Sequence, residues 1–167
     1  MDVKVIPCVP ITQENFSEYG DFMTVFTREA DAVNDELSFW NKLGAMDHTG
    51  NTSVSIVQTY GKNGLIEKNL ERHQYTEETL IPTDDIVVVT ALSDSDNSGI
   101  PDLHTVKAFA VKKGSAVKFH RNTWHHAPLT QLPETNTFVI FKETTPSEDC
   151  FVIDLPEQFG LYYQVKI

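Results

Sequence analysis

The chain has too few cysteines to rely on disulfides, since only Cys8 and Cys150 occur among its 167 residues. Two thiols this far apart cannot form the framework that stabilises small secreted domains, so we expect two free cysteines in a reducing, cytosolic compartment. Basic residues are also scarce, with 13 Lys and Arg against 24 Asp and Glu and a net charge of −11. This deficit argues against nucleic acid and anionic membranes as partners, because both bind basic surfaces.

Long apolar stretches are missing as well. No window approaches the roughly 20 apolar residues that a membrane-spanning helix needs. The opening residues, Met1 to Cys8, lack the basic and apolar segments of a secretory signal peptide. The content of 40% hydrophobic and 22% charged residues is ordinary for a soluble globular protein. We therefore expect one domain, residues 1–167, with no linker, repeat or low-complexity tract.

Helical patterns are few, and short β-type runs dominate. The one clear helix is expected over residues 12–20, where Thr12 can cap the first turn and Gly20 can end the last. Residues 27–46 fit a helix or a strand and stay unassigned. Strands are expected at 3–6, 22–26, 53–60, 65–73, 86–92, 105–111, 116–120, 137–141 and 150–155. Many short strands separated by turns predict an all-β barrel or sandwich.

The first polar cluster lies in residues 71–82. On a strand, Glu71 and His73 project from the same face, while Leu70 and Arg72 face the other way. With Glu78 or Glu77 added, two carboxylates and an imidazole would suit a divalent first-row metal with open positions for substrate. Taken alone, however, such a segment is more often an exposed strand end carrying an ion pair.

The second cluster, residues 120–129, contains His120, His125 and His126, three of the six histidines, together with Trp124. Adjacent side chains of a strand point to opposite faces, so only one of His125 and His126 can face a given site. The plainer interpretation is a core histidine bonded to the backbone, with Trp124 as packing. Three histidines in seven positions favour a functional role for at least one, because each buried imidazole needs its own partner.

These two clusters resemble the paired motifs of the cupin superfamily. Glu71-x-His73-x4-Glu78 is similar to the first motif, with Glu in place of its leading His. Gly114-x5-His120-x-Asn122-x2-His125 is similar to the second. The resemblance implies a cupin-type double-stranded β-helix, that is, a jelly-roll barrel, here with a short N-terminal helix. It also places Glu71, His73, Glu78 and His125 at the metal-ligand positions.

A closer resemblance is to the ureidoglycolate lyase family of cupins. The family's Leu-Glu-Arg-His start and following Ile-Pro match residues 70–73 and 81–82. Its Tyr-His-Arg-x-x-Trp-His-His-Pro-Leu signature is similar to residues 119–129, with Ala127 inserted. Residues 11–21, 101–103 and 107–109 also resemble family segments, so the likeness covers nearly the whole chain.

The resemblance implies a carbon–nitrogen lyase that splits (S)-ureidoglycolate into glyoxylate and urea during allantoin and purine breakdown. It further implies a homodimer, a small carboxylate substrate and a divalent transition metal such as nickel, zinc or manganese. His120 or His126 would then transfer the proton, and Trp124 would contact substrate. A metal-free mechanism, in which Glu and His act directly on the substrate, is also open.

Several departures from the family pattern keep other functions open. Glu78 stands where the family carries Gln, Ala127 interrupts its His-His-Pro-Leu run, and Phe39-Trp40 replace an Arg-Tyr pair. If that Arg binds the substrate carboxylate, Lys107 would have to replace it. The alternatives are a metal-dependent cupin acting on another small carboxylic acid and a non-catalytic cupin that binds a small ligand.

One acidic segment, residues 94–102, imitates the first half of a calcium-binding loop. The twelfth position would be Thr105 instead of a bidentate Glu, and no helices are expected on either side. We therefore expect an exposed acidic hairpin loop there.

Overall fold

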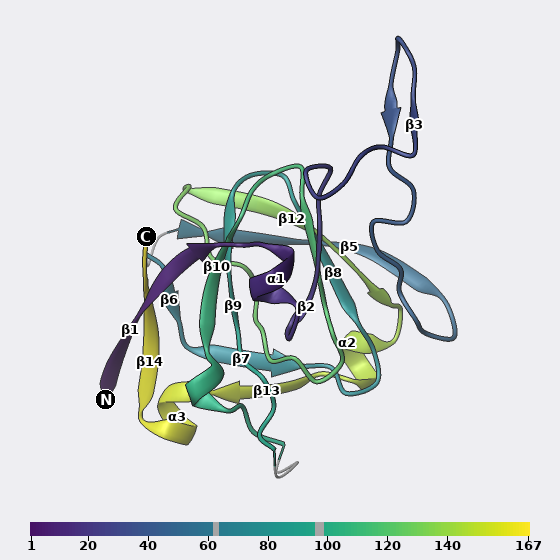
Figure 1. The fold of residues 1–167 in the computed structure, drawn as a ribbon. Helices are drawn as coiled ribbons and strands as arrows, with labels where there is room; N and C mark the ends of the chain where they lie inside the picture. Colours follow the sequence, from purple (N-terminus) through teal and green to yellow (C-terminus); the bar gives the residue numbers. More distant parts are fainter. Residues whose placement is uncertain (62–63, 96–98) are drawn as a thin grey trace.

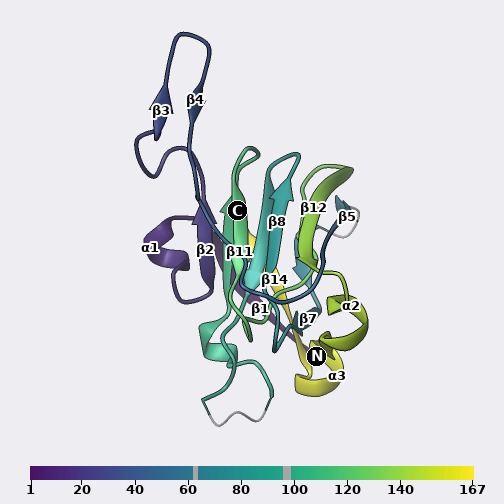
Figure 2. The same cartoon turned by 90° about the vertical axis from the view of Figure 1, so that its right-hand side faces the viewer.

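The computed structural model describes residues 1–61, 64–95 and 99–167, and most of its strands form two five-stranded sheets. One sheet has the strand order β6-β14-β1-β10-β9, and the other has the order β2-β11-β8-β12-β5. Figure 1 and Figure 2 show the two sheets facing each other. The first sheet comprises β1 (Asp2–Pro10), β6 (Ile66–Glu67), β9 (Ile86–Thr90), β10 (Lys107–Val111) and β14 (Leu161–Lys166). The second comprises β2 (Gly20–Met23), β5 (Thr52–Tyr60), β8 (Glu78–Pro82), β11 (Ala116–Phe119) and β12 (Glu134–Lys142).

The main core lies between these sheets. Strand alternation sends Val88 and Phe109 inward from the first sheet, and Leu80, Val117 and Val139 inward from the second. A second core cluster fills the space beneath β7 (Asn69–Arg72) and α3 (Leu155–Phe159), and contains Leu70, Ala91, Trp124, Leu155, Leu161 and Tyr163. The all-β prediction of a jelly-roll barrel with a short N-terminal helix is therefore confirmed.

The sheet that contains β1 is mixed. β1 pairs in parallel with β10 on one side and with β14 on the other, whereas β9 and β10 are antiparallel. The second sheet is antiparallel throughout its described pairings. β1 also extends to Pro10, beyond its expected end at residue 6. Its first part pairs with β14, and its last part pairs with β10.

The N-terminal helix is shorter than the sequence predicts. α1 spans only Gln13–Phe16, and a capping box joins Thr12 to Asn15. Gly20, expected to end the helix, instead begins β2, where a Cβ would lie 1.9 Å from the carbonyl oxygen of Lys118. The close approach of β11 therefore accounts for glycine at this position, and the strand expected at 22–26 is Gly20–Met23.

Two other expected segments also differ, and two short helices were not expected. The run 65–73 is divided into β6 and β7, which belong to different sheets. The stretch expected as one strand at 150–155 is β13 (Phe151–Asp154), and it is followed directly by α3. α2 (Thr145–Glu148) and the 3-10 helix Leu103–Thr105 were not expected. α3 nevertheless carries ordinary signals, namely the Asp154 cap, Pro156 and Gly160 at φ 67°.

The segment left unassigned, residues 27–46, contains a projecting hairpin. Its strands, β3 (Ala32–Val33) and β4 (Ser38–Phe39), pair only with each other. Figure 1 and Figure 2 both show the hairpin extending away from the two sheets. Leu37 and Phe39, two of the apolar residues that fit either pattern, are each 53% exposed and do not enter the core.

Both cysteines are free thiols, as expected. In the acidic segment 94–102, the Asp94 amide donates to the Ile100 carbonyl, while residues 96–98 lie outside the described residues. The predicted loop conformation therefore stays a prediction. In the described part of the chain, no helix is long and apolar enough to cross a membrane.

Candidate metal and catalytic site

The two polar clusters meet because β7 pairs with the segment after β11. Glu71 and His125 form an antiparallel bridge, in which the Glu71 amide donates to the His125 carbonyl at 2.6 Å and the reverse bond measures 2.8 Å. Directly opposed residues in such a pair project to the same side. His73, two residues after Glu71, joins them, and ligand atoms of all three side chains lie within 4.8 Å of one another.

Both imidazoles are held in one orientation by backbone carbonyls. His73 Nδ1 lies 2.7 Å from the Asp149 carbonyl, and His125 Nδ1 lies 2.9 Å from the Thr123 carbonyl. A carbonyl can only accept, so each Nδ1 carries the proton and donates it. The Nε2 atoms are thereby left to face the cluster. Phe119 stacks on the His125 ring, with centroids 4.1 Å apart and planes inclined by 11°.

Glu78, the first residue of β8, lies against both Nε2 atoms. Its Oε2 is 3.1 Å from His73 Nε2, and its Oε1 is 3.6 Å from His125 Nε2. Burial acts to raise the pKa of Glu78, but the His125 and His73 imidazoles outweigh it and lower the pKa to about 2. Burial likewise acts to lower the pKa of His73, while Glu78 raises it overall. The Glu78 carboxylate is therefore ionised, and it stabilises the protonated, positively charged form of the His73 imidazole.

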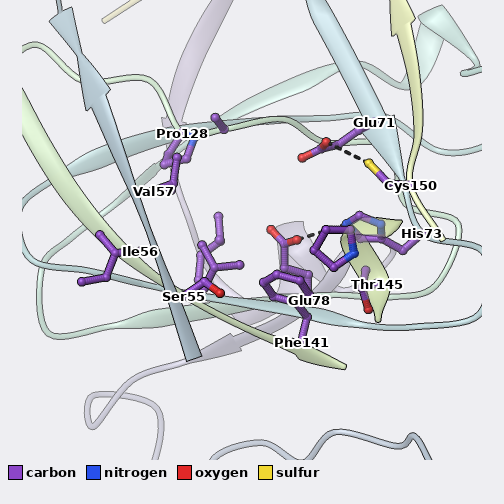
Figure 3. Close-up of a pocket in the computed structure, with 14 residues that line it drawn as sticks. Ser55, Ile56, Val57, Glu71, His73, Glu78, Pro128, Phe141, Thr145 and Cys150 are labelled. Atoms are coloured by element: carbon purple, nitrogen blue, oxygen red, sulfur yellow. Dashed lines mark hydrogen bonds and ion pairs between the residues drawn. The ribbon is translucent and has the colours of Figure 1, made fainter. Parts of the chain in front are cut away.

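Glu71, His73 and Glu78 line a cavity of about 240 Å³. Figure 3 shows Glu71, His73 and Cys150 on one side of it, across from Val57 and Pro128. The Cys150 thiol donates to Glu71 Oε2 at 3.4 Å. Burial of the sulfur and the nearby Glu71 carboxylate raise the pKa of Cys150 to about 12, so the thiol stays protonated and serves as a donor.

The donor set fits a divalent transition metal. His125 Nε2 is buried and lacks a hydrogen-bond partner among the described residues, which is costly unless a cation or a proton occupies its lone pair. Donation of Nδ1–H to a carbonyl is also the usual arrangement of a metal-binding histidine. Glu71, His73 and His125 thus form the candidate ligand set, and Glu78 contacts both imidazoles.

Three residues expected at the site lie elsewhere. His120 follows β11, is partly exposed, and approaches Asp21 at 3.5 Å. Lys107 is exposed, with its Nζ over the Tyr19 ring. Trp124 is buried in the second core cluster, and the Arg72 guanidinium lies over its ring. Strand alternation explains the Trp124 position, because its neighbour His125 takes the cavity side. The structure therefore gives no geometric support for substrate contact by these side chains.

His126 occupies a different environment from His125. Its Nδ1 lies 3.2 Å from Glu67 Oε1, and the Glu67 side chain is only 3% exposed. Burial acts to lower the pKa of His126, but the Glu67 carboxylate raises it overall. Both residues line a neighbouring cavity of about 660 Å³, which shares Ala127 and Pro128 with the first.

Sequence reasoning missed the residues that hold the ligands in place. Asp149 is buried, and its carboxylate accepts bonds from the amides of Gln74 and Tyr75 and from the Thr76 hydroxyl at 2.8–2.9 Å. Its carbonyl also receives the His73 proton. Nothing in the local sequence around Asp149 indicates a partner 76 residues away. Phe119, in contrast, lies directly before the second cluster, where the family signature begins with Tyr, and nothing in the sequence indicated that it stacks on His125.

Two solved structures match part of this chain at low similarity. The oxalate decarboxylase of Lactobacillus farciminis superposes with a TM-score of 0.43 and 17% identity, over 66% of this chain and 28% of the other. A cupin-like protein of Thermotoga maritima gives a TM-score of 0.32 and 18% identity, over 64% of this chain and 78% of the other.

Sequence relatives cover much more of the chain. The family model described as ureidoglycolate lyase matches residues 3–161. Proteins named ureidoglycolate lyase from Escherichia coli O9:H4 strain HS and Shigella boydii serotype 18 are each 33% identical over 156 residues. The match covers 90% of this chain and 94% of each relative. The match along almost the full length, together with the cluster of carboxylates and imidazoles in the barrel, shows that the chain belongs to the ureidoglycolate lyase family.

Proposed function

We propose that this protein is a carbon–nitrogen lyase that cleaves ureidoglycolate to glyoxylate and urea, and that the reaction takes place in the cavity beside Glu71, His73, Glu78 and His125. The observation that carries the proposal is the orientation of the two imidazoles. Both Nδ1 protons are donated to backbone carbonyls, so both Nε2 atoms face one buried point beside two carboxylates. Family membership provides the substrate.

A divalent metal is part of this proposal. Glu71, His73 and His125 would hold it, with Glu78 either as a fourth ligand or as the acceptor that orients the imidazoles. When bound, such an ion polarises substrate oxygens and lowers the pKa of a hydroxyl group that it contacts. The imidazole ligands suit nickel and zinc, and the carboxylate ligands suit manganese.

The reaction requires two proton movements. The substrate hydroxyl must lose its proton as the carbonyl forms, and the nitrogen must gain one in order to leave as urea. His126 stays in the proposal as the proton-transfer residue because Glu67 Oε1 lies 3.2 Å from its Nδ1 while its side chain remains 31% exposed. It lines the adjoining cavity, so a water molecule would have to connect it to the substrate.

A metal-free mechanism has its own support in the His73–Glu78 pair. The raised pKa of His73 favours the imidazolium, whose Nε2–H could protonate the departing nitrogen, while Glu71 takes the hydroxyl proton. Each such acid or base contributes about 10²–10⁴-fold to the rate.

The decisive experiment measures glyoxylate and urea release from racemic ureidoglycolate by the purified protein, before and after chelation and after returning single metals. Equal release of the two products, lost with the chelator and restored by a metal, supports the metal-dependent lyase. Chelator-resistant release supports the metal-free mechanism. No release above the uncatalysed rate under any condition overturns the proposed function and favours a ligand-binding role.

Two further expectations belong to the same proposal. A homodimer is implied by the family resemblance and would be seen by light scattering. A reducing, cytosolic location is consistent with the two free thiols.

A further inference from the structure

The cavity has an uneven lining. Its polar cluster occupies one side, and Val57 and Pro128 form the wall opposite it (Figure 3). Leu80, Val139 and Phe141 add further side chains that cannot hydrogen-bond, with Phe141 paired across the sheet with Glu78. Figure 3 shows Val57 and Pro128 on the far side of the cavity from Glu71 and His73. A substrate whose reacting carbon lies at the cluster must therefore direct its other end toward this apolar wall.

Few polar groups are available to bind that other end. Among the described residues that line the cavity, none is Lys, Arg, Asn or Gln. The Thr145 hydroxyl is buried and donates to Thr76 Oγ1 at 3.1 Å, and Pro128 and Pro146 have no amide proton. Ser55 is exposed at the mouth, where it competes with water. The wall also includes Ala127, the residue that interrupts the family's His-His-Pro-Leu pattern.

Ureidoglycolate is N-carbamoyl-2-hydroxyglycine, and its outer end is a polar NH₂ group. Replacing that NH₂ by CH₃ gives N-acetyl-2-hydroxyglycine, which has nearly the same shape and the same reacting centre. A site that recognises an NH or OH group by hydrogen bonds rejects the analogue that lacks it by about 10⁴–10⁵-fold, because its own polar groups are left unpaired. An apolar wall has no polar groups to leave unpaired, so it does not discriminate against the analogue with CH₃ in this way.

We propose that this protein cleaves a wider substrate class, the N-acyl-2-hydroxyglycines with small apolar acyl groups, and that the wall around Val57 selects the acyl group. The hydroxyl proton goes to a base of the cluster, the carbonyl of glyoxylate forms, and the C–N bond breaks with its electron pair on nitrogen. The nitrogen takes up one proton and leaves as a primary amide. No water, oxidant or reductant is consumed. This inference rests on the proposed function, because it uses the same reaction at the same site.

The size of the acyl group is limited by the cavity. At about 240 Å³ it lies below the roughly 300–1,000 Å³ of pockets that hold drug-sized ligands. Each methylene buried against the wall should raise kcat/KM about fourfold until the space is filled. We expect the order propanoyl above acetyl, followed by a decline for longer chains.

The test compares glyoxylate release from ureidoglycolate and from the N-acetyl, N-propanoyl and N-butanoyl compounds. Each rate is divided by the uncatalysed rate of the same compound, with the metal that supports ureidoglycolate cleavage present throughout. We expect the N-acetyl compound to be cleaved with a kcat/KM within about tenfold of that for ureidoglycolate. A preference for ureidoglycolate of about 10³-fold or more would overturn the inference and leave the proposed function intact. Failure of ureidoglycolate itself, with cleavage of the acyl compounds, would overturn the proposed substrate alone. Failure of all four would overturn both.

Variants of β5 assign the effect to the wall. Val57→Thr keeps the shape but adds a hydroxyl, and should shift the acetyl-to-ureido ratio of kcat/KM about fivefold toward ureidoglycolate. Val57→Ala should move the optimum to a longer acyl group, a gain that loss of folding cannot produce. Val54→Thr is the matched control, because Val54 lies on the outer face of the same strand and is 67% exposed. Unchanged ratios in both Val57 variants would show that the wall does not select the acyl group.

Discussion

Two histidine–carboxylate groups lie on either side of Ala127 and Pro128, and they differ in what holds the imidazole. In the cavity cluster of Glu71, His73, Glu78 and His125, backbone carbonyls accept both Nδ1 protons. In the His126 pair, the Glu67 carboxylate accepts the Nδ1 proton, and the His126 side chain is 31% exposed.

The difference matters chemically. Neutral carbonyl partners fix which nitrogen faces inward, so both buried Nε2 atoms meet the Glu78 carboxylate and need a proton or a cation between them, an arrangement suited to metal binding. A carboxylate partner stabilises the imidazolium of a solvent-accessible ring, which suits proton transfer. Adjacent histidines of one strand therefore have different expected roles.

The largest expected effect comes from removing a ligand of the cavity cluster. His73→Ala deletes one candidate metal ligand and the partner of Glu78, so ureidoglycolate cleavage should fall by about 10³-fold or more and bound metal should be lost. Activity assays and elemental analysis measure the two effects. His104→Ala is the control, since His104 is an exposed histidine away from both cavities. Full activity and metal content in the His73 variant would remove His73 from the site.

Changing the second group tests whether the roles are separate. His126→Asn should lower turnover by about 10²-fold while the metal content is retained, because a proton-transfer group is lost and the ligands are not. His120→Asn, which alters the exposed histidine beside Asp21, should leave turnover unchanged. Loss of metal from the His126 variant would show that the two groups form one site.

Asp149 positions the cavity cluster, because its carbonyl accepts the Nδ1 proton of His73. Asp149→Asn replaces a carboxylate that accepts three bonds with an amide that can accept at only one atom, so metal affinity should fall about 10–100-fold. The free energy of unfolding should also fall by about 1–3 kcal/mol. Asp154→Asn, which changes the exposed cap of α3, is the comparison for a purely structural loss. Titration of the variants with a single metal ion and thermal melts would separate the two effects. An Asp149 variant that binds metal normally would contradict the positioning role.

The smallest effect concerns pH in the metal-free protein. Glu78 has a folded pKa of about 2 against an ordinary 4.5, so its stabilising contribution is present above pH 4.5 and is lost as the pH falls toward 2. The pKa of His73 is raised from 6.5, so its contribution is complete below pH 6.5 and declines as the pH rises through the raised value. The pair should therefore stabilise most between pH 4.5 and 6.5.

Thermal melts across pH in the presence of a chelator would check this window. Glu78→Gln should flatten the dependence at both ends. Asp85→Asn should change it little, because the ion pair of Asp85 with Lys112 is exposed and screened by solvent. Identical pH curves for the natural protein and the Glu78 variant would contradict the assignment.

Much of this comparison could be predicted from sequence. Strand alternation was enough to put Glu71 and His73 on one face and to separate His125 from His126. It could not give the Glu71–His125 bridge, because register between distant strands depends on the whole sheet. The same lack of long-range information explains why the expected substrate contact of Lys107 has no geometric support. That role was inferred from the absence of the family's Arg, and not from any contact.

The elements of the fold also divide into those that a local sequence pattern predicts and those that depend on distant contacts. Continuous apolar runs such as Ile86–Thr90 identified their strands directly, because both faces are buried. The hairpin at 27–46 stayed ambiguous because Trp40 and Phe39 fit either period, and no core contact decides between them. The short helices α2 and α3 lie in segments too brief for a periodic signal to develop.

The parallel pairing of β1 with β14 affects how the chain can fold. Asp2–Pro10 pairs with a strand made some 150 residues later, and contacts of such long sequence separation slow folding. During synthesis this early strand must wait until Leu161–Lys166 has emerged, with Val3 and Val5 still unpaired and exposed. The first sheet can therefore be completed only after translation has passed β14.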